Sequence, residues 1–355
     1  MRTEWTNNKY LSNGEGSGGG EMVLIPQEEM RETFFAVLTG VGFTNEKAKT
    51  CAEIFTANSI DGVYTHGVNR FPVFVDYVKE GFVDKDAEPS LQAAMGGIEV
   101  WQGNGGPGPL NALKATDRAV KLAQQSGIGC VAIANTNHWM RGGYYGWRAA
   151  DQGCVLIAWT NTIANMPAWG AIDSKLGNNP LVISLPYSDS AIVLDMAMSQ
   201  YSFGAMEQAA AKGEALHMTG GFDKEGNETR DPRAILASER PMPIGYWKGA
   251  GLSLLLDILT AVLSGGLATY QVSQQQKENN VSQVFVCIDL AKLPHHSSIP
   301  KIIEGIIADY HGSKTEGEKS VRYPGEGVLQ RRNENQKKGI PVLTGIWEQI
   351  LKLKP

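Results

Sequence analysis

The sequence predicts a mixed α/β fold rather than a regular series of strand–helix–strand units. Three observations predict this class: helical spacing of apolar residues over 26–79, short strands with Pro and Gly turns beyond Val155, and a helical, charged segment at 295–355. The chain has 355 residues, of which 42% are hydrophobic. It is therefore long enough for two domains and apolar enough for a buried core.

The first eighty residues are predicted to contain a tail and three helices. Residues 1–21 are polar, with nothing at regular spacing to hold them on a core, so we expect a disordered tail. The run Gly18–Glu21 before Met22 also fits a translated ribosome-binding site, in which case the native chain starts at Met22. The predicted helices span residues 26–40, 44–57 and 71–79. Gly62 and Gly67 predict a turn or loop before the third helix.

Residues 98–134 match the sequence pattern of a dinucleotide-binding unit. A strand is predicted at 98–101, a helix at 110–125 and a strand at 130–133, and Gly103–Gly108 matches the glycine fingerprint. However, Pro107 removes a backbone N–H from the loop that should hold the pyrophosphate, and no Asp or Glu ends the second strand. We therefore interpret this segment as a Gly-rich connection in a βαβ unit.

The rest of the chain is predicted to alternate short strands with a few helices. The predicted strands are 155–160, 181–185, 191–196 and 283–288, and the helices are 200–212 and about 249–263. A polar, hairpin-like segment follows the first of these helices, and residues 295–355 are expected to pack back on the N-terminal helices.

Charge and cysteine usage exclude several classes of protein. The 32 basic and 37 acidic residues give a net charge of −5 without basic blocks, so a nucleic-acid partner is not expected. No secretion signal or apolar run of about 18 residues is apparent, because Asp257 interrupts the most apolar segment. We expect a cytoplasmic protein without membrane contact, and reduced thiols at Cys51, Cys130, Cys154 and Cys287.

Two histidines lie in short polar segments that a core would not require. His66 is followed by Arg70, and His138 precedes Arg141 and the pair Gly142-Gly143. Imidazole can transfer a proton near neutral pH, and arginine binds a carboxylate through two parallel hydrogen bonds. These segments favour a site for a small, negatively charged 2-oxo acid, with solvated surface residues as the alternative. Neither histidine has a Cys or carboxylate at metal-ligand spacing, so no metal is predicted.

Two further segments are candidates for ligand binding. Trp247-Lys248 lies between glycines at the start of an apolar helix, where an anion or a ring could bind. Glycines that allow close helix packing are the alternative. Asp195 is a carboxylate in an apolar strand, so it needs a partner: it could hold a ribose, orient a histidine, or only cap the next helix.

These segments, in this order, resemble the type-2 family of malate/L-lactate dehydrogenases, whose fold is not of the Rossmann type. The likeness runs from about Pro26 onward and is most specific at residues 137–143 and 245–249. It implies an NAD(P)-binding domain at 136–294 with a mixed, largely antiparallel sheet. It also implies a helix-rich α/β domain for substrate binding and dimerisation, built from 22–135 with 295–355.

The same resemblance implies roles for individual residues. His66 is implied as the proton donor, and Arg70 and His138 as substrate-binding residues. Thr65 stands where the family usually has serine, which keeps the hydroxyl. The implied cofactor-binding residues are Ala191, Ile192, Val193, Leu194, Asp195, Met196, Ala197, Trp247, Lys248, Gly325, Glu326 and Gly327.

The implied activity is reduction of a 2-oxo sugar acid, 2,3-diketo-L-gulonate, at C2 to 3-dehydro-L-gulonate. NADH is the expected cofactor, with NADPH as the alternative, and a homodimer is the expected assembly. Three other functions stay open: a dehydrogenase for malate, lactate or another small 2-hydroxy acid; a metal-dependent sugar-acid hydrolase or lyase with histidine ligands; and a non-catalytic binding protein for an acidic sugar.

Overall fold

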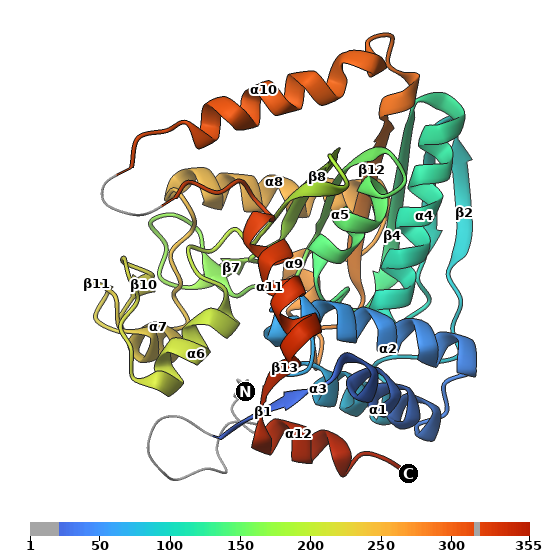
Figure 1. The fold of residues 1–355 in the computed structure, drawn as a ribbon. Helices are drawn as coiled ribbons and strands as arrows, with labels where there is room; N and C mark the ends of the chain where they lie inside the picture. The colour runs from blue at the N-terminus through green and yellow to red at the C-terminus, as the bar shows by residue number, and fades with distance from the viewer. Residues whose placement is uncertain (1–20, 316–319) are drawn as a thin grey trace.

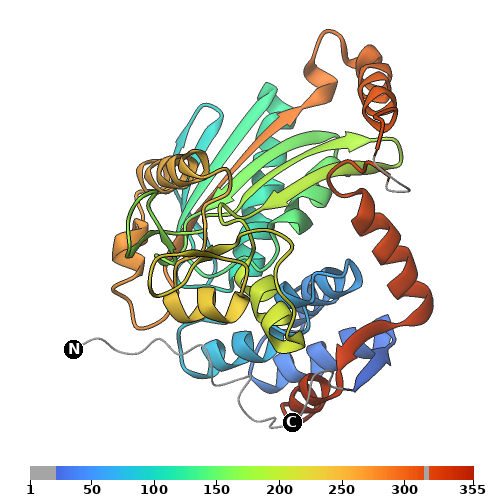
Figure 2. The same ribbon diagram turned by 90° about the vertical axis from the view of Figure 1, so that its left-hand side faces the viewer.

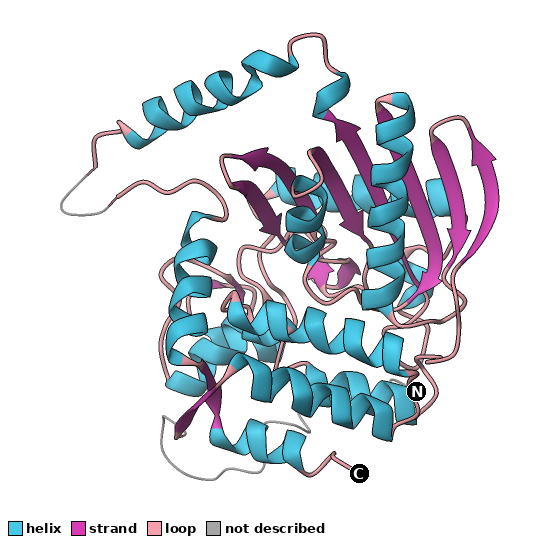
Figure 3. Ribbon diagram, turned by 45° about the vertical axis from the view of Figure 1, so that its right-hand side comes forward, coloured by secondary structure: helices cyan, strands magenta, loops and turns pink. Residues whose placement is uncertain are grey.

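A seven-stranded sheet lies above a layer of helices in the computed structural model, which describes residues 21–315 and 320–355 (Figure 1; Figure 3). The strands follow the order β2 (Ser90–Met95), β3 (Ile98–Gln102), β4 (Ile128–Thr136), β12 (Val281–Asp289), β5 (Cys154–Thr160), β8 (Leu181–Tyr187) and β9 (Ser190–Met196). Only β3 and β4 run parallel, and the other neighbouring pairs of this sheet are antiparallel. The predicted mixed, largely antiparallel sheet is confirmed.

Helices cover both faces of the sheet: α4 (Gly108–Ser126) and α5 (Gly142–Ala150) on one face, α8 (Trp247–Ser264) on the other (Figure 2). Successive side chains of a strand point to opposite faces of the sheet, so β4 and β12 each contribute to the cores on both faces. Val131 and Phe285 belong to the cluster under α4 and α5, whereas Ala132 and Val284 belong to the cluster under α8. A strand buried on both faces needs apolar residues at successive positions, and residues 130–134 of β4 and 284–288 of β12 meet this need.

The glycine-rich segment at 103–108 connects β3 to α4, and the predicted βαβ unit is confirmed. The Asn137 side-chain amide donates to the carbonyl oxygens of Gly105, at 2.8 Å, and Gly106, at 3.0 Å. A Cβ atom on Gly108 would collide with the carbonyl oxygens of Asn137 and His138. The glycines therefore let this loop pack closely against the His138 segment.

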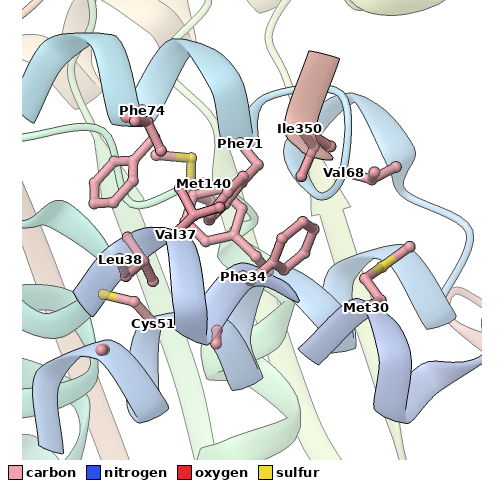
Figure 4. Packing of buried hydrophobic residues seen from close by; sticks show 14 of the residues in the cluster. Met30, Phe34, Val37, Leu38, Cys51, Val68, Phe71, Phe74, Met140 and Ile350 are labelled. Atoms are coloured by element: carbon pink, nitrogen blue, oxygen red, sulfur yellow. The ribbon is translucent and has the colours of Figure 1, made fainter. Parts of the chain in front are cut away.

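Four helices form the layer below the sheet: α1 (Gln27–Gly40), α2 (Asn45–Ile60), α3 (Phe71–Lys79) and α12 (Thr344–Leu351). Their apolar faces meet in one core, where the rings of Phe34 and Phe71 stack with centroids 4.0 Å apart (Figure 4). Met140, which follows β4, also packs in this core and joins the layer to the sheet (Figure 4).

The end of the C-terminal segment, from Glu326 on, returns to the N-terminal helices as predicted, whereas α10 (Ile299–His311) lies at the opposite end of the molecule (Figure 1). Strand β1 (Met22–Ile25) pairs antiparallel with β13 (Ile340–Leu343), and Ile350 of α12 lies in the same core as α1. The expected domain boundary between residues 135 and 136 falls inside β4, so both expected segments contribute strands to one sheet. The helical layer itself is formed by residues 27–79 with 344–351.

A small lobe follows β9, with its own core of Met206, Leu216 and Ile235. Its first helix begins at Phe203, three residues later than predicted, because Ser202 caps it by accepting from Ala205 N at 3.2 Å. The lobe contains α6 (Phe203–Lys212), β10 (Gly221–Phe222), β11 (Glu228–Thr229) and α7 (Pro232–Ser238). The remaining elements are β6 (Met166–Pro167), β7 (Ser174–Leu176), α9 (Thr269–Val272), α10 (Ile299–His311) and α11 (Glu326–Lys338).

Helix α8 corrects the expectation that no apolar segment reaches the length of a membrane span. It has 18 residues with mean hydropathy 1.3, so its length and composition alone would allow a span. Its polar residue Asp257 is held inside the fold, where it accepts from Asn161 Nδ2 at 3.1 Å and Thr269 N at 2.8 Å. The buried face of α8 packs on the sheet, as expected for a helix that covers a sheet layer.

Candidate active site

The two histidines singled out by the sequence meet between the helical layer and the sheet. Their ring centroids are 5.6 Å apart and the ring planes are inclined by 22°. His66 ends a short 3₁₀ helix (Tyr64–His66) after α2, and His138 lies in the turn that follows β4. The packing of Met140 among the helices brings the two segments together.

His66 is held by its backbone and by one neighbouring hydroxyl. Asn58 Nδ2 donates to the His66 carbonyl oxygen at 3.0 Å, and Thr65 Oγ1 lies 3.1 Å from His66 Nδ1. The Thr65 contact leaves Nε2 as the nitrogen free for a ligand. Burial, followed by the positive charges of Arg70 and Arg141, lowers the pKa of His66 to about 4. The imidazole is therefore neutral at pH 7 until a negative charge enters the site.

His138 is fixed in one neutral tautomer. Its Nδ1 accepts a hydrogen bond from Met140 N at 2.9 Å, so the proton of the neutral ring is on Nε2. The turn that makes this bond places Met140 at φ +68°, a conformation unfavourable for a side chain of its size. Burial lowers the pKa of His138 well below its usual value, with further lowering by Arg70 and His66. The ring can thus donate a hydrogen bond to an oxygen without carrying charge.

Arg70 and His138 line one small pocket together with Tyr77, Asn137 and Glu278. The rest of its wall is apolar and consists of Val73, Phe74, Val83 and Met140. Within the described part of the chain, Arg70 makes no ion pair with a carboxylate. Its guanidinium is therefore available to an anionic ligand. Asn137 Oδ1 is buried and also lacks a hydrogen-bond partner among the described residues.

Two glutamates, Glu278 and Glu207, interact electrostatically with Arg70, and no sequence motif identifies either. The pKa of Glu278 is raised by burial, with Arg70 acting in the opposite direction, followed by the hydrogen bond from Ile163 N. The pKa of Glu207 on α6 is also raised by burial and lowered by Arg70. Of these two residues, Glu278 lines the pocket that contains Arg70.

A buried ion-pair network supports the histidines. Asp61, at the end of α2, binds Arg141 and also accepts from Arg332 Nε at 2.6 Å and Nη2 at 2.9 Å. Asp61 and Arg141 are 7% and 5% exposed, so this pair lies in the interior. Arg332 stacks its guanidinium over the Trp147 ring at 4.7 Å. The network joins α2, α5 and α11, and sequence reasoning missed it because its members are far apart in the chain.

Asp195 is placed at the start of α5. Its Oδ2 accepts from Gly143 N at 2.7 Å and lies 3.8 Å from Arg141 Nε. A carboxylate at a helix N-terminus stabilises the helix, but α5 precedes Asp195 in the chain. The expected cap on the next helix is wrong, because Ser202 caps α6. Burial raises the pKa of Asp195, while Arg141 and the hydrogen bond from Gly143 lower it. Arg141 therefore links this carboxylate to the Asp61 network.

The first and third expected cofactor segments lie together. Residues Ala191–Met196 belong to β9, the edge strand of the sheet, and Ala197 directly follows it. Val193 N donates to Pro324 O at 3.0 Å. A Cβ atom on Gly325 would lie 3.1 Å from Val193 N, so glycine permits this close approach. Glu326 and Gly327 begin α11, and Glu326 Oε2 accepts from Tyr323 N at 3.1 Å.

The second expected cofactor segment lies beside the end of β9. Ile244 N donates to Met198 O at 2.8 Å, which positions the start of α8. Trp247 is 64% exposed and Lys248 is also exposed. Tyr246 has φ +63°, a strained value that holds the turn before the helix. An exposed indole and an ammonium at this place fit the ring and phosphate groups of a dinucleotide.

Metal-ligand geometry gives no support to a metal-dependent alternative. Within residues 21–315 and 320–355, no three His, Cys, Asp or Glu side chains gather in a metal-binding arrangement. The cysteines are unpaired thiols, as expected, and Cys51, Cys154 and Cys287 are buried. His66 and His138 lie near arginines, which would oppose a bound cation.

Known proteins are similar to this chain in sequence and in fold. The profile of the family described as malate/L-lactate dehydrogenase matches residues 25–351. A 2,3-diketo-L-gulonate reductase of Citrobacter koseri is 40% identical over 328 residues, which are 91% of this chain and 98% of that protein. A malate dehydrogenase structure from Entamoeba histolytica, 24% identical, superposes with a TM-score of 0.88 over 94% of this chain and 97% of its own. A malate dehydrogenase from Pyrococcus horikoshii, 25% identical, has a TM-score of 0.85 over 96% and 97%.

Proposed function

Because this chain belongs to the malate/L-lactate dehydrogenase family and is an oxidoreductase acting on CH–OH groups, we propose that its substrate is 2,3-diketo-L-gulonate. Reduction of the C2 carbonyl would give 3-dehydro-L-gulonate. The 40% identical Citrobacter koseri relative bears the name of this activity. The observation that carries the proposal is the stacked pair His66 and His138 beside an Arg70 that has no carboxylate partner among the described residues.

Arg70 holds the substrate in this proposal. Its guanidinium binds the C1 carboxylate, which fixes the adjacent C2 carbonyl near the two imidazoles. His138 donates its Nε2 proton as a hydrogen bond to a substrate oxygen, since Met140 N occupies its Nδ1. The carbonyl is thereby oriented before reaction, and Asn137 Oδ1 can accept from a neighbouring hydroxyl.

His66 is the proposed proton donor to the oxygen of C2. The bound carboxylate offsets the charge of Arg70, which is one of the groups that depress the pKa of His66. Substrate binding therefore favours the protonated imidazole, and the proton passes from Nε2 to the oxygen as the C2–H bond forms. Arg141 keeps this proton labile, because its positive charge also lowers the His66 pKa.

The family implies a nicotinamide cofactor, and NADH is our proposal for this chain, with NADPH as the alternative. The reduced nicotinamide supplies the hydride when bound. We propose that β9 with Ala197, Trp247, Lys248 and residues 325–327 hold it. The backbone of Gly325 lies against Val193, and Trp247 presents an exposed ring beside the end of that strand. We also propose a cytoplasmic location.

The exposed apolar face of α8 supports the proposal of a homodimer. Its members are all at least 43% exposed: Leu254, Leu255, Ile258, Leu259 and Val262. Contiguous apolar patches of this kind mark protein–protein interfaces. Light scattering at micromolar concentration would test the dimer, and Val262→Asp should then shift the mass towards a monomer, whereas a monomeric wild type would overturn it.

The experiment that tests the activity is NADH oxidation with 2,3-diketo-L-gulonate beside oxaloacetate, pyruvate and glyoxylate, repeated with NADPH. A kcat/KM advantage of several orders of magnitude for diketogulonate would support the proposed substrate. Activity only on the simple oxo acids would instead favour a malate or lactate dehydrogenase, which the family also contains. Retention of activity with a chelator would separate the reductase from a metal-dependent enzyme.

A further inference from the structure

Glu278 occupies a fixed position in the wall of the substrate pocket. It lies between α9 and β12, and the preceding residue Lys277 places its ammonium over the rings of Tyr77, at 4.9 Å, and Phe82, at 5.2 Å. Lys277 also pairs with Glu80. On the other side, the Glu278 carboxylate accepts from Ile163 N at 3.4 Å. Contacts with α3 and with the end of β5 therefore hold the glutamate in place.

The Glu278 carboxylate has hydrogen-bonding capacity to spare. Within the described residues, the Ile163 contact is its one hydrogen bond, and it uses a single oxygen, Oε1. An ionised carboxylate can accept about four hydrogen bonds. Because Glu278 lines the same pocket as Arg70 and His138, its second oxygen is available to a ligand there. Hydroxyl groups are the ligand groups that can donate to it.

The charges around Arg70 restrict which anion fits. One arginine can bind one carboxylate in two parallel hydrogen bonds. Glu278 lines the same pocket as that arginine, so a second carboxylate on the ligand would face the carboxylate of Glu278. Juxtaposed like charges at a binding site exclude wrong partners. A chain of hydroxyls meets no such repulsion.

We propose that Glu278 is a specificity-determining residue, which accepts hydrogen bonds from the hydroxylated chain of a sugar acid and repels the second carboxylate of dicarboxylic oxo acids. This inference rests on the proposed function and adds to it a reason for preferring sugar acids over oxaloacetate. Arg70 keeps its role for the single carboxylate.

The test is Glu278→Gln, which preserves shape and removes charge. We expect kcat/KM for diketogulonate to fall about tenfold, kcat/KM for oxaloacetate to rise about tenfold, and kcat/KM for pyruvate to stay within about threefold. The ratio of the first two should therefore change about a hundredfold. Glu304→Gln, at an exposed position of α10, is the matched control and should leave all three unchanged.

Glu278→Asp keeps the charge and shortens the side chain, so it should lose diketogulonate activity while still rejecting oxaloacetate. Thermal melting and NADH affinity, equal to wild type, would show that both variants fold. An unchanged diketogulonate-to-oxaloacetate ratio in Glu278→Gln would overturn the inference. A wild type inactive with diketogulonate would instead overturn the proposed function, so the two failures are distinguishable.

Discussion

The proposed proton-transfer end of the site and the proposed cofactor end differ in how far their side chains are buried. At the first end, His138 Nδ1 accepts a hydrogen bond from Met140 N, and Asp61 pairs with the buried Arg141 and the half-buried Arg332. At the second end, Trp247 is 64% exposed. At the outer edge of β9, Val193 N donates a hydrogen bond to Pro324 O.

The difference shows how the structure divides positioning from binding. Groups that must be within hydrogen-bond reach of a reacting atom are fixed before any ligand arrives, which lowers the reorganisation needed during reaction. Groups that offer contact area can stay exposed, because a large ligand completes their packing when it binds. Substitutions at the first end should therefore affect rate or stability, and those at the second end mainly affinity.

The largest expected effect is that of His66→Ala. Loss of a general acid usually lowers kcat by about 10²–10⁴-fold, and the cofactor affinity should stay the same because His66 faces the substrate. Steady-state kinetics with diketogulonate and NADH, with a separate titration of NADH binding, would measure both. His295→Ala, at an exposed histidine, is the control. An unchanged kcat in His66→Ala would remove this residue from the mechanism.

Asp61→Asn tests whether the fixed end depends on its ion pairs. Arg141 would remain buried without a full counter-charge, so the free energy of unfolding should fall by about 3–5 kcal/mol. Asp173→Asn is a suitable comparison, since Asp173 pairs with Lys175 at an exposed position and should change stability by less than about 1 kcal/mol. Urea unfolding followed by circular dichroism measures both variants. An equally small decrease in the free energy of unfolding in both variants would contradict a stabilising role of the Asp61 ion pairs.

The sequence predicted the helical layer better than the site. Helix α3 follows directly from the apolar spacing in residues 71–79, and the Gly-rich loop was correctly interpreted because Pro107 is incompatible with a pyrophosphate-binding loop. Local patterns of this kind are visible to sequence reasoning. Two-residue strands such as β6 and β10 were missed, because they are too short to show a period.

The supporting residues of the site could not be predicted, because their partners are distant in the chain. Asp61 and Arg332 are 271 positions apart, and nothing near either residue indicates the other. Glu278 lies in a polar segment without a motif. It can be recognised as a pocket residue only in the structure, where α3 and the His138 turn line the same pocket. By contrast, the unusual local composition around His66 and His138 was visible, although their contact was not.

The pH dependence of the reductase reaction should separate the free enzyme from the substrate complex. The pKa of His66 in the free enzyme is lowered to about 4, so the protonated fraction of the imidazole rises about tenfold for each unit that the pH falls from 7 to 5. Because the proton donor must be protonated, kcat/KM for reduction should rise by the same factor. In the complex, the substrate carboxylate raises that pKa, and kcat should therefore decline only at higher pH. A kcat/KM profile that is flat over this range would contradict the donor role, provided that melting temperatures show a folded protein at pH 5.

Arg70→Lys tests the carboxylate clamp within the fixed end. Lysine keeps the charge but loses the planar pair of donors, so the KM for diketogulonate should rise about tenfold to a hundredfold. NADH affinity should be unchanged. Arg148→Lys, on an exposed arginine paired with Asp117, is the matched control. Equal losses of substrate and NADH affinity in Arg70→Lys would argue against a clamp that acts on the substrate alone.

Trp247→Ala should give the smallest effect and test the open end. Loss of one stacked aromatic ring typically weakens binding by about 1 kcal/mol, which corresponds to roughly a tenfold increase in the Kd for NADH. At saturating NADH, kcat should stay near the wild-type value, because the indole is proposed to bind the cofactor and takes no part in proton transfer. Tyr270→Ala, at a residue 63% exposed in α9, controls for the general removal of a surface ring. If Trp247→Ala instead lowered kcat at saturation, the indole would be positioning the cofactor for reaction as well as binding it, and the proposed division between a fixed end and an open end would fail at this residue.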